Sequence, residues 1–318
     1  ISLLLAMTLS TIAFAQGFLF ENASRRQLRG MFDQYVPPAH IERMMNDPSA
    51  YQFEGESKEL TVLFSDIRSF TTISEQLSAA NLKRMLNEYF TPITKVIFDN
   101  DGTIDKYVGD MVMAFWGAPL DDPKHAEKAL RAALAMQRET ARLREEFQKR
   151  GLPPIHIGIG LNTGFMNVGD MGSSYRRAYT VLGDAVNLGS RLESITKFYG
   201  VGILISESTR NQAPNFICRY VDCIIVKGKE EPVNVFEVLG ETHEVNDATL
   251  VEIAQQGIAT TAYMEGDWDK AERLYNELKQ LRDCKLYDVY LHRIQVLREQ
   301  QQQGLLPEWN GVYRHTEK

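Results

Sequence analysis

Cysteine is scarce in this sequence. Its 318 residues include only Cys218, Cys223 and Cys284. Three thiols cannot form the disulfide framework of a small secreted domain, and no two of them have the spacing of zinc ligands. We therefore expect ordinary core or surface thiols in a reducing compartment.

An excess of positive charge is also missing. Lys and Arg number 35 against 42 Asp and Glu, which gives a formal net charge of −7. Nucleic-acid binding depends on clustered positive charge, so the sequence predicts no nucleic-acid partner. Hydrophobic residues make up 44% of the chain and charged residues 24%, which excludes general disorder and allows a substantial core. The length suggests about two domains.

Charge is absent from residues 1–20, where most residues are apolar. About 20 apolar residues match the thickness of a bilayer, and Arg25, Arg26 and Arg29 follow at once. We predict a transmembrane helix, the last of several spans in a longer protein, at the cell (inner) membrane with the following domain in the cytoplasm. A buried helix, an artificial start of the chain and a signal peptide cleaved near Ala13-Phe14-Ala15 are alternatives, although no basic residue precedes the run.

Residues 21–56 predict a helical linker. Gly30 and Pro37-Pro38 interrupt it, and the proline pair must end any helix that arrives from the membrane. The same pair can start a short helix over residues 39–45.

Residues 57–240 alternate between strand and helix patterns in the order βαββαβ. This order predicts an α/β, ferredoxin-like sandwich with helices on one face of a mainly antiparallel sheet. Gly109-Asp110 separates two strand-like runs and indicates a two-residue hairpin. The predicted strands are 60–64, 103–108, 111–116, 155–161, 201–205, 217–226 and 233–238, and the predicted helices are 82–97, 123–149 and 186–198.

Residues 241–318 predict a helical tail. Helical patterns cover 254–264, 268–281 and 287–301. Gly266-Asp267-Trp268, followed by Ala271, Tyr275 and Leu278, resembles part of a tetratricopeptide repeat, and a generic helical cap is the alternative.

Two carboxylates are predicted to meet at one edge of the sheet. Asp66 directly follows the strand 60–64, and Asp110 lies at the tip of the hairpin. Oxygen ligands of this kind suit Mg²⁺ or Mn²⁺ better than zinc. Taken singly, however, Asp66 could simply cap a helix and Asp110 could simply form a turn.

Four segments together resemble class III nucleotidyl cyclases. Residues 64–71 (FSDIRSFT) resemble the first metal-binding segment of that family, and residues 106–110 (KYVGD) resemble the second. Residues 179–188 (YTVLGDAVNL) with 191–193 (RLE), and then residues 226–229 (VKGK), follow in the family's order. The resemblance implies an enzyme that binds two divalent metal ions, Mg²⁺ or Mn²⁺, and converts ATP to 3′,5′-cyclic AMP and pyrophosphate in signal transduction.

The resemblance also implies individual roles. Asp66, Asp110 and the carbonyl of Ile67 correspond to the metal ligands. The segment from Ile67 to Phe70 is expected to begin a helix whose free N–H groups favour phosphate, which places Phe70 and Thr71 at the substrate. The other expected roles are ribose orientation by Asn187, α-phosphate stabilisation by Arg191 and binding of the terminal phosphates by Lys227.

Lys106 and Thr180 correspond to the positions that choose the purine. Guanylyl members typically carry Glu and Cys there, so the resemblance favours ATP over GTP. Lys donates a hydrogen bond to N1 of adenine, whereas guanine carries an N–H at that position. Thr replaces the Asp of many adenylyl members and marks a subgroup that resembles bicarbonate-responsive soluble cyclases, so bicarbonate or CO₂ is a hypothetical activator.

In this family the aspartates come from one chain and the other site residues from its partner. The resemblance therefore implies an obligatory homodimer with two equivalent sites, in which residues 163–180 include the arm that embraces the partner. Residues 32–38 (FDQYVPP) resemble the element that precedes membrane-bound members, and a passive tether is the alternative.

Three other functions are possible at this stage. Guanylate cyclisation is disfavoured by Lys106 and Thr180, and a diguanylate cyclase by the absence of a Gly-Gly-Asp-Glu-Phe run. A non-catalytic, nucleotide-binding regulatory domain is disfavoured because every expected site position is filled.

Overall fold

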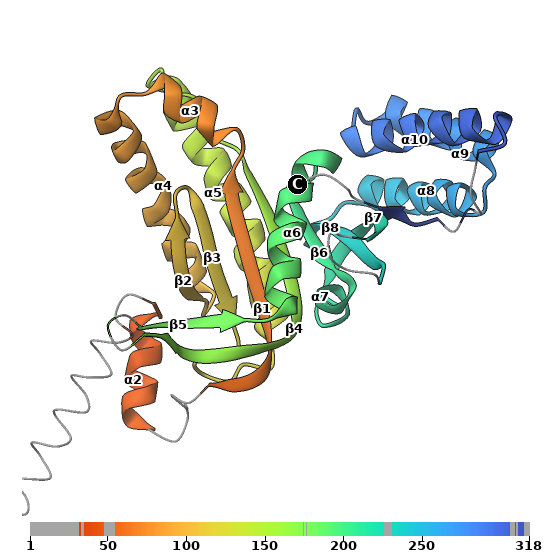
Figure 1. Cartoon of the computed structure of the whole chain (residues 1–318). Coiled ribbons are helices and arrows are strands. Elements are labelled where there is room, and N and C mark those ends of the chain that lie inside the picture. Colours follow the sequence, from red (N-terminus) through yellow and green to blue (C-terminus); the bar gives the residue numbers. More distant parts are fainter. Residues whose placement is uncertain are drawn as a thin grey trace, which may run out of the picture.

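The computed structural model describes residues 32, 35–47, 55–173, 175, 177–225, 231–305, 309 and 311–314 (Figure 1). The predicted membrane span 1–20 and Lys227 lie outside these residues. Within the described part of the chain, no helix is both long and apolar enough to cross a bilayer.

Four antiparallel strands form the centre of the sheet. Strand β1 (Glu56–Ile67) lies between β3 (Met111–Trp116) and β4 (Ile157–Gly172), and β2 (Thr103–Val108) completes the order β2-β3-β1-β4. This is the strand order of a ferredoxin-like βαββαβ unit, as the sequence predicts. Gly109 forms the β2–β3 turn with a φ of 65°, a left-handed conformation that glycine adopts without steric cost.

The sheet continues beyond β4 through β6 (Ile203–Ser206), β8 (Val233–Glu241), β7 (Phe216–Ile225) and β9 (Tyr313–Arg314). Of these contacts, β4–β6 and β7–β9 are parallel and the others antiparallel. The second half of β4 pairs instead with β5 (Arg177–Leu182), and these two strands form an arm at one end of the molecule (Figure 1).

Helices cover both faces of the sheet, so the expectation of helices on one face is wrong. Leu63 of β1 packs in one core with α4 (Ala79–Asp99) and α5 (His125–Lys149). The neighbouring Val62 points to the opposite face, where α6 (Asp184–Tyr199) lies so close that a Cβ on Gly189 would come within 2.9 Å of it.

Two glycines of β4 let α6 lie directly on the sheet. A Cβ on Gly160 would lie 2.1 Å from the backbone nitrogen of Glu193, and a Cβ on Gly158 would lie 2.3 Å from Oγ1 of Thr196. Real side chains do not tolerate such contacts, so these glycines set the height of α6 above the sheet.

The linker residues pack on the same face as α6. Helix α2 (Pro38–Asn46) begins after Pro37, in agreement with the prediction. Phe32, Val36, Ile41 and Met44 are buried in a core with β1, β3 and the arm. These described residues of the linker are therefore part of the folded unit.

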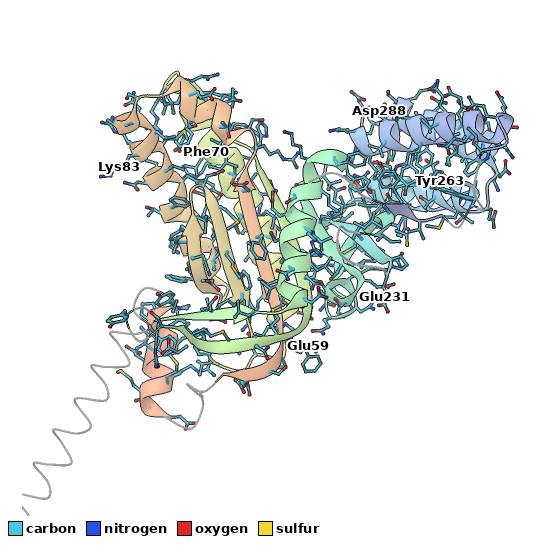
Figure 2. The ribbon with its side chains drawn as sticks, viewed as in Figure 1. Glu59, Phe70, Lys83, Glu231, Tyr263 and Asp288 are labelled. Carbon is cyan, nitrogen blue, oxygen red and sulfur yellow. The ribbon has the colours of Figure 1, made fainter. Side chains whose placement is uncertain are left out.

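Three helices form the tail: α8 (Asp247–Met264), α9 (Trp268–Leu281) and α10 (Lys285–Gln302). They share a core with α6 and β6–β8 that includes Leu192, Val221, Tyr263 and Tyr290. Tyr263 is labelled in Figure 2. The expected apolar face of α9 is buried at Trp268, Ala271, Tyr275 and Leu278. Two short helices, α3 (Phe70–Gln76) and α7 (Glu207–Asn211), complete the described fold.

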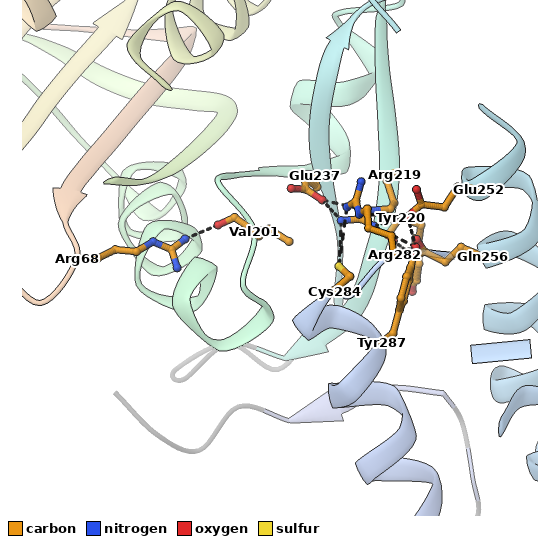
Figure 3. A network of polar contacts seen from close by, with 10 residues as sticks. All are labelled: Arg68, Val201, Arg219, Tyr220, Glu237, Glu252, Gln256, Arg282, Cys284 and Tyr287. Atoms are coloured by element: carbon orange, nitrogen blue, oxygen red, sulfur yellow. Dashed lines mark hydrogen bonds and ion pairs between the residues drawn. The ribbon is translucent and has the colours of Figure 1, made fainter. Parts of the chain in front are cut away.

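Buried polar contacts also join the tail to the sheet (Figure 3). The Arg219 guanidinium, only 2% exposed, donates to Glu237 and to the hydroxyl of Tyr287 on α10. Close by, Arg68 donates to the carbonyl of Val201 at 2.5 Å, which links the end of β1 to the loop after α6.

Candidate active site

Asp66 and Asp110 lie side by side at one end of the central sheet. The N–H of Ile67 lies 3.1 Å from Oδ1 of Asp66 and 3.1 Å from Oδ2 of Asp110, so that one donor serves both carboxylates. The β2–β3 turn brings Asp110 there, because β3 pairs with β1 up to Ser65, the residue before Asp66.

The local structure around Asp66 differs from the expectation in two ways. Asp66 is the penultimate residue of β1, and the following helix starts only at Phe70. The N–H of Ile67 is consequently engaged by the carboxylates. Phe70 packs against the apolar core, and the carbonyl of the exposed Thr71 accepts from Ser74.

Negative charge is concentrated at this point. Burial, and then the neighbouring Asp66, raise the pKa of Asp110 to about 7. Burial and Asp66 likewise raise the pKa of Glu193 on α6 to about 7. A cation at the pair would relieve this repulsion, so the residues fit a divalent metal ion.

The two carboxylates would need further ligands to hold such an ion. No group of three or more His, Cys, Asp or Glu side chains suited to a metal occurs among the described residues. Mg²⁺ commonly binds one or two carboxylates and fills its remaining positions with water and substrate phosphates. The backbone carbonyl of Ile67 is a further available oxygen.

Asn187 and Arg191 lie one turn apart on α6, the helix that the β4 glycines hold against the sheet. Asn187 is exposed and Arg191 is partly buried. Within the described part of the molecule, Nη1 of Arg191 is buried and makes no hydrogen bond. An unpaired guanidinium nitrogen of this kind suits an anionic ligand.

Lys106 and Thr180 come together through a residue that the sequence analysis did not single out. Thr180 of β5 donates to Oδ2 of Asp105 at 2.5 Å, and Nζ of Lys106 lies 3.1 Å from Oδ1 of Asp105. Asp105 is only 3% exposed, whereas the next residue of β2, Lys106, is exposed. The sequence itself shows only an aspartate directly before the lysine and does not reveal its burial.

Large apolar side chains are exposed on the arm and at the end of β2. Phe165 of β4 is 71% exposed and Leu182 of β5 is 53% exposed. Val108 and Tyr107, beside the Gly109-Asp110 turn, are also exposed. Exposed apolar side chains of this size indicate contact surfaces.

Comparison with known proteins identifies the fold. Residues 54–239, more than half of the chain, match the family model described as the adenylate and guanylate cyclase catalytic domain. The chain is 38% identical over 216 residues to adenylate cyclase 1 of Rhizobium meliloti, and 40% identical over 190 residues to an adenylate cyclase of Anabaena cylindrica. These matches cover 68% and 57% of the chain.

Solved structures give the same answer for the fold. The crystal structure of the adenylyl cyclase CyaB from P. aeruginosa matches with a TM-score of 0.57 and 39% identity, over 61% of this chain and 100% of that one. The guanylyl cyclase Cya2 matches with a TM-score of 0.55 and 35% identity, over 60% and 97%. The chain spans only 32% and 37% of the two curated relatives. It belongs to the family of adenylate and guanylate cyclase catalytic domains.

Proposed function

We propose that this chain is an adenylate cyclase that converts ATP to 3′,5′-cyclic AMP and pyrophosphate. The observation that carries the proposal is the shared contact of Asp66 and Asp110 with the N–H of Ile67, which gathers two carboxylates where a divalent ion is needed. The curated relatives quoted above are named adenylate cyclases, which supports the same activity.

In the reaction the ribose 3′-hydroxyl loses its proton and its oxygen bonds to the α-phosphorus. The bond from that phosphorus to the bridging oxygen of the β-phosphate breaks, so that pyrophosphate leaves. Asp66, Asp110 and the carbonyl of Ile67 would hold two Mg²⁺ or Mn²⁺ ions. When bound, these ions lower the pKa of the attacking hydroxyl and neutralise phosphate charge.

Other residues of the chain position the substrate. Asn187 orients the ribose, and the guanidinium of Arg191 stabilises the charge that develops on the α-phosphate. Loss of such a group costs about 3 kcal/mol, or roughly a hundredfold in rate. Lys227 is proposed to bind the terminal phosphates, and Phe70 and Thr71 to lie near the substrate.

Two copies of the chain are proposed to share each site, with the aspartates from one protomer and Lys106, Thr180, Asn187, Arg191 and Lys227 from its partner. The exposed Phe165 and Leu182 support this arrangement, because an arm with apolar side chains is suited to embrace a second copy.

Membrane attachment and regulation through the linker are further parts of the proposal. They are supported by the uncharged run 1–20 with its following arginines, and by the contact of the linker with the catalytic strands. The N–H of Ile104 in β2 donates to the carbonyl of Tyr35 at 2.7 Å, and the Phe32 ring lies 5.2 Å from that of Tyr179 in β5. Movement of the linker would therefore reach both strands that carry the purine-selecting residues.

One experiment separates the candidate functions. The purified chain is incubated with Mn²⁺ and either ATP or GTP, and the products are separated by chromatography. Cyclic AMP and pyrophosphate in equal amounts are expected. Cyclic GMP as the main product would instead favour a guanylate cyclase. The similarity to the guanylyl cyclase Cya2 is the reason for testing GTP. Binding of ATP without any cyclic product would indicate a regulatory domain.

A further inference from the structure

Asp105 occupies an unusual position in β2. The ladder between β2 and β3 shifts register between Ile104 and Lys106, so Asp105 is the extra residue of a β-bulge. A bulge re-aims the side chain that it carries. Here it turns a carboxylate into the protein, where only 3% of the residue is exposed.

Buried carboxylates need partners, and those of Asp105 come from the two strands that carry the purine-selecting residues. Its Oδ2 accepts from the hydroxyl of Thr180 at 2.5 Å and from the N–H of Val181 at 3.4 Å. Its Oδ1 has no hydrogen bond of good geometry among the described residues, but lies 3.1 Å from Nζ of Lys106.

These contacts fix which way Thr180 can hydrogen-bond. A hydroxyl has one proton, and a carboxylate can only accept. Because Thr180 gives its proton to Asp105, its oxygen can only accept from a ligand. The amino group at C6 of adenine donates, whereas the C6 oxygen of guanine accepts and would face the lone pairs of Thr180.

Lys106 is restrained in a similar way. Its ammonium can only donate, and the charge of Asp105 draws it toward Thr180. In that position it can donate a hydrogen bond to N1 of adenine, which is an acceptor. N1 of guanine carries a proton, so the two donors would face each other. One buried carboxylate thus sets the polarity of the Thr180 hydroxyl and the position of the Lys106 ammonium, and both then suit adenine.

We propose that Asp105 is a specificity-determining positioning residue, which selects ATP by orienting the Thr180 hydroxyl and the Lys106 ammonium. The inference rests on the proposed nucleotide site of this domain. It does not depend on how two chains share that site, because Asp105, Lys106 and Thr180 belong to one chain.

The test compares Asp105→Asn with the unaltered chain. An amide has one accepting oxygen, which can face Thr180 or Lys106 but not both. We measure kcat/KM for ATP, for GTP and for purine riboside triphosphate, which lacks the 6-amino group. The variant should lose roughly tenfold in kcat/KM for ATP, the value of one hydrogen bond in a buried site, and much less for purine riboside triphosphate.

Two further variants define the mechanism. Thr180→Val keeps the side-chain shape without the hydroxyl and should abolish the preference for the 6-amino group. The preference is expressed as kcat/KM for ATP divided by kcat/KM for purine riboside triphosphate. In the Thr180→Val background, Asp105→Asn should change this ratio far less than it does in the unaltered chain. Asp121→Asn, which alters an exposed acid paired with Lys58, is the control and should leave the ratio unchanged.

Binding of non-cyclisable α,β-methylene analogues of the nucleotides provides a second readout. A chain that prefers the ATP analogue, loses that preference in Asp105→Asn and yet forms no cyclic product would overturn the proposed function and support this inference. A folded Asp105→Asn variant with an unchanged preference for ATP over purine riboside triphosphate, in both turnover and binding, would overturn the inference. Should Asp105→Asn not fold, an unchanged preference in Thr180→Val would overturn it equally.

Discussion

Arg293 of α10 and Asp222 of β7 form a buried ion pair across the boundary between the tail and the sheet. Nη1 of Arg293 lies 2.5 Å from Oδ2 of Asp222, and the two side chains are 8% and 1% exposed. The hydroxyl of Tyr199, at the end of α6, donates to the same carboxylate oxygen. The tail is thereby tied to the helix that carries Asn187 and Arg191.

Loss of Arg293 should therefore destabilise the folded chain strongly. Arg293→Met leaves Asp222 buried without its cation, which costs about 3–5 kcal/mol for a pair of this kind. We expect a correspondingly lower free energy of unfolding in urea. Arg298→Met is the matched control, because its partners Asp269 and Glu272 are exposed, and should cost less than about 1 kcal/mol. Equal effects of the two substitutions would contradict the prediction.

The metal-free protein should lose stability as the pH rises toward neutrality. Burial and Asp66 raise the pKa of Asp110 to about 7 in the folded chain, whereas an unfolded aspartate titrates near about 4. Below the lower value both states are protonated. Between the two values only the unfolded state loses its proton, so the folded state becomes less favourable up to about pH 7.

This pH dependence can be isolated with Asp110→Asn. Melting temperatures are recorded with EDTA from pH 4 to 8 for both proteins, and their difference cancels the contribution of groups that do not interact with Asp110. The melting temperature of the variant minus that of the unaltered chain should increase with pH and then level off. Added Mn²⁺ should stabilise only the unaltered chain, and most strongly above pH 7. Parallel curves for the two proteins would exclude the raised pKa.

Much of this fold could be predicted because its signals are local. The Gly109-Asp110 pair gave the β2–β3 hairpin with the bounds that the structure shows. The face on which α6 lies could not be predicted, because helical periodicity shows that a helix has an apolar side but not which face of a sheet receives it. The small residues Gly158 and Gly160 decide that question, and their role emerges only once α6 is placed.

The site shows the same limit. Asp66 and Asp110 could be predicted to meet, since a strand end and a neighbouring turn bring them together. Asp105 could not be assigned, because the bulge breaks the two-residue alternation from which inward and outward side chains are read. The role of Lys227 stays a prediction, since it lies outside the described residues.

Replacement of the linker should change basal turnover. Tyr35 accepts from Ile104, the residue before Asp105, and Val36 is fully buried. Exchange of residues 35–38 for Gly-Ser-Gly-Ser removes the buried side chain and loosens this contact. We expect an altered rate of cyclic AMP formation at saturating ATP. Glu42→Gln, on the exposed side of α2, is the control. An unchanged rate would indicate a passive tether.

Bicarbonate should raise turnover if the threonine at position 180 marks a bicarbonate-responsive cyclase. The measurement compares sodium bicarbonate with sodium chloride at equal ionic strength and fixed pH, so that neither salt nor proton effects contribute. A several-fold increase in kcat is expected, as an activator that stabilises the active state by about 1 kcal/mol would give. Turnover that ignores bicarbonate under these conditions would end the hypothesis.

Shared sites predict that two inactive chains can restore one another. Asp110→Ala removes a proposed metal ligand and Arg191→Ala a proposed phosphate ligand, so each homodimer should be nearly inactive. In a mixed dimer, however, the aspartates of the Arg191→Ala chain meet the intact Arg191 of the Asp110→Ala chain. If the chains pair at random, about half of the dimers in an equal mixture are mixed, and each mixed dimer has one intact site out of two. The mixture should therefore regain roughly a quarter of the normal activity.

The control for this experiment is Asp66→Ala mixed with Asp110→Ala. Both substitutions damage the same half of the site, so no pairing can create an intact one. Recovery in the first mixture and none in the second, measured as cyclic AMP formed per milligram, is the expected result. If neither mixture recovers although mixed dimers are detected, each site is built within a single chain. The exposed Phe165 and Leu182 would then need a different partner.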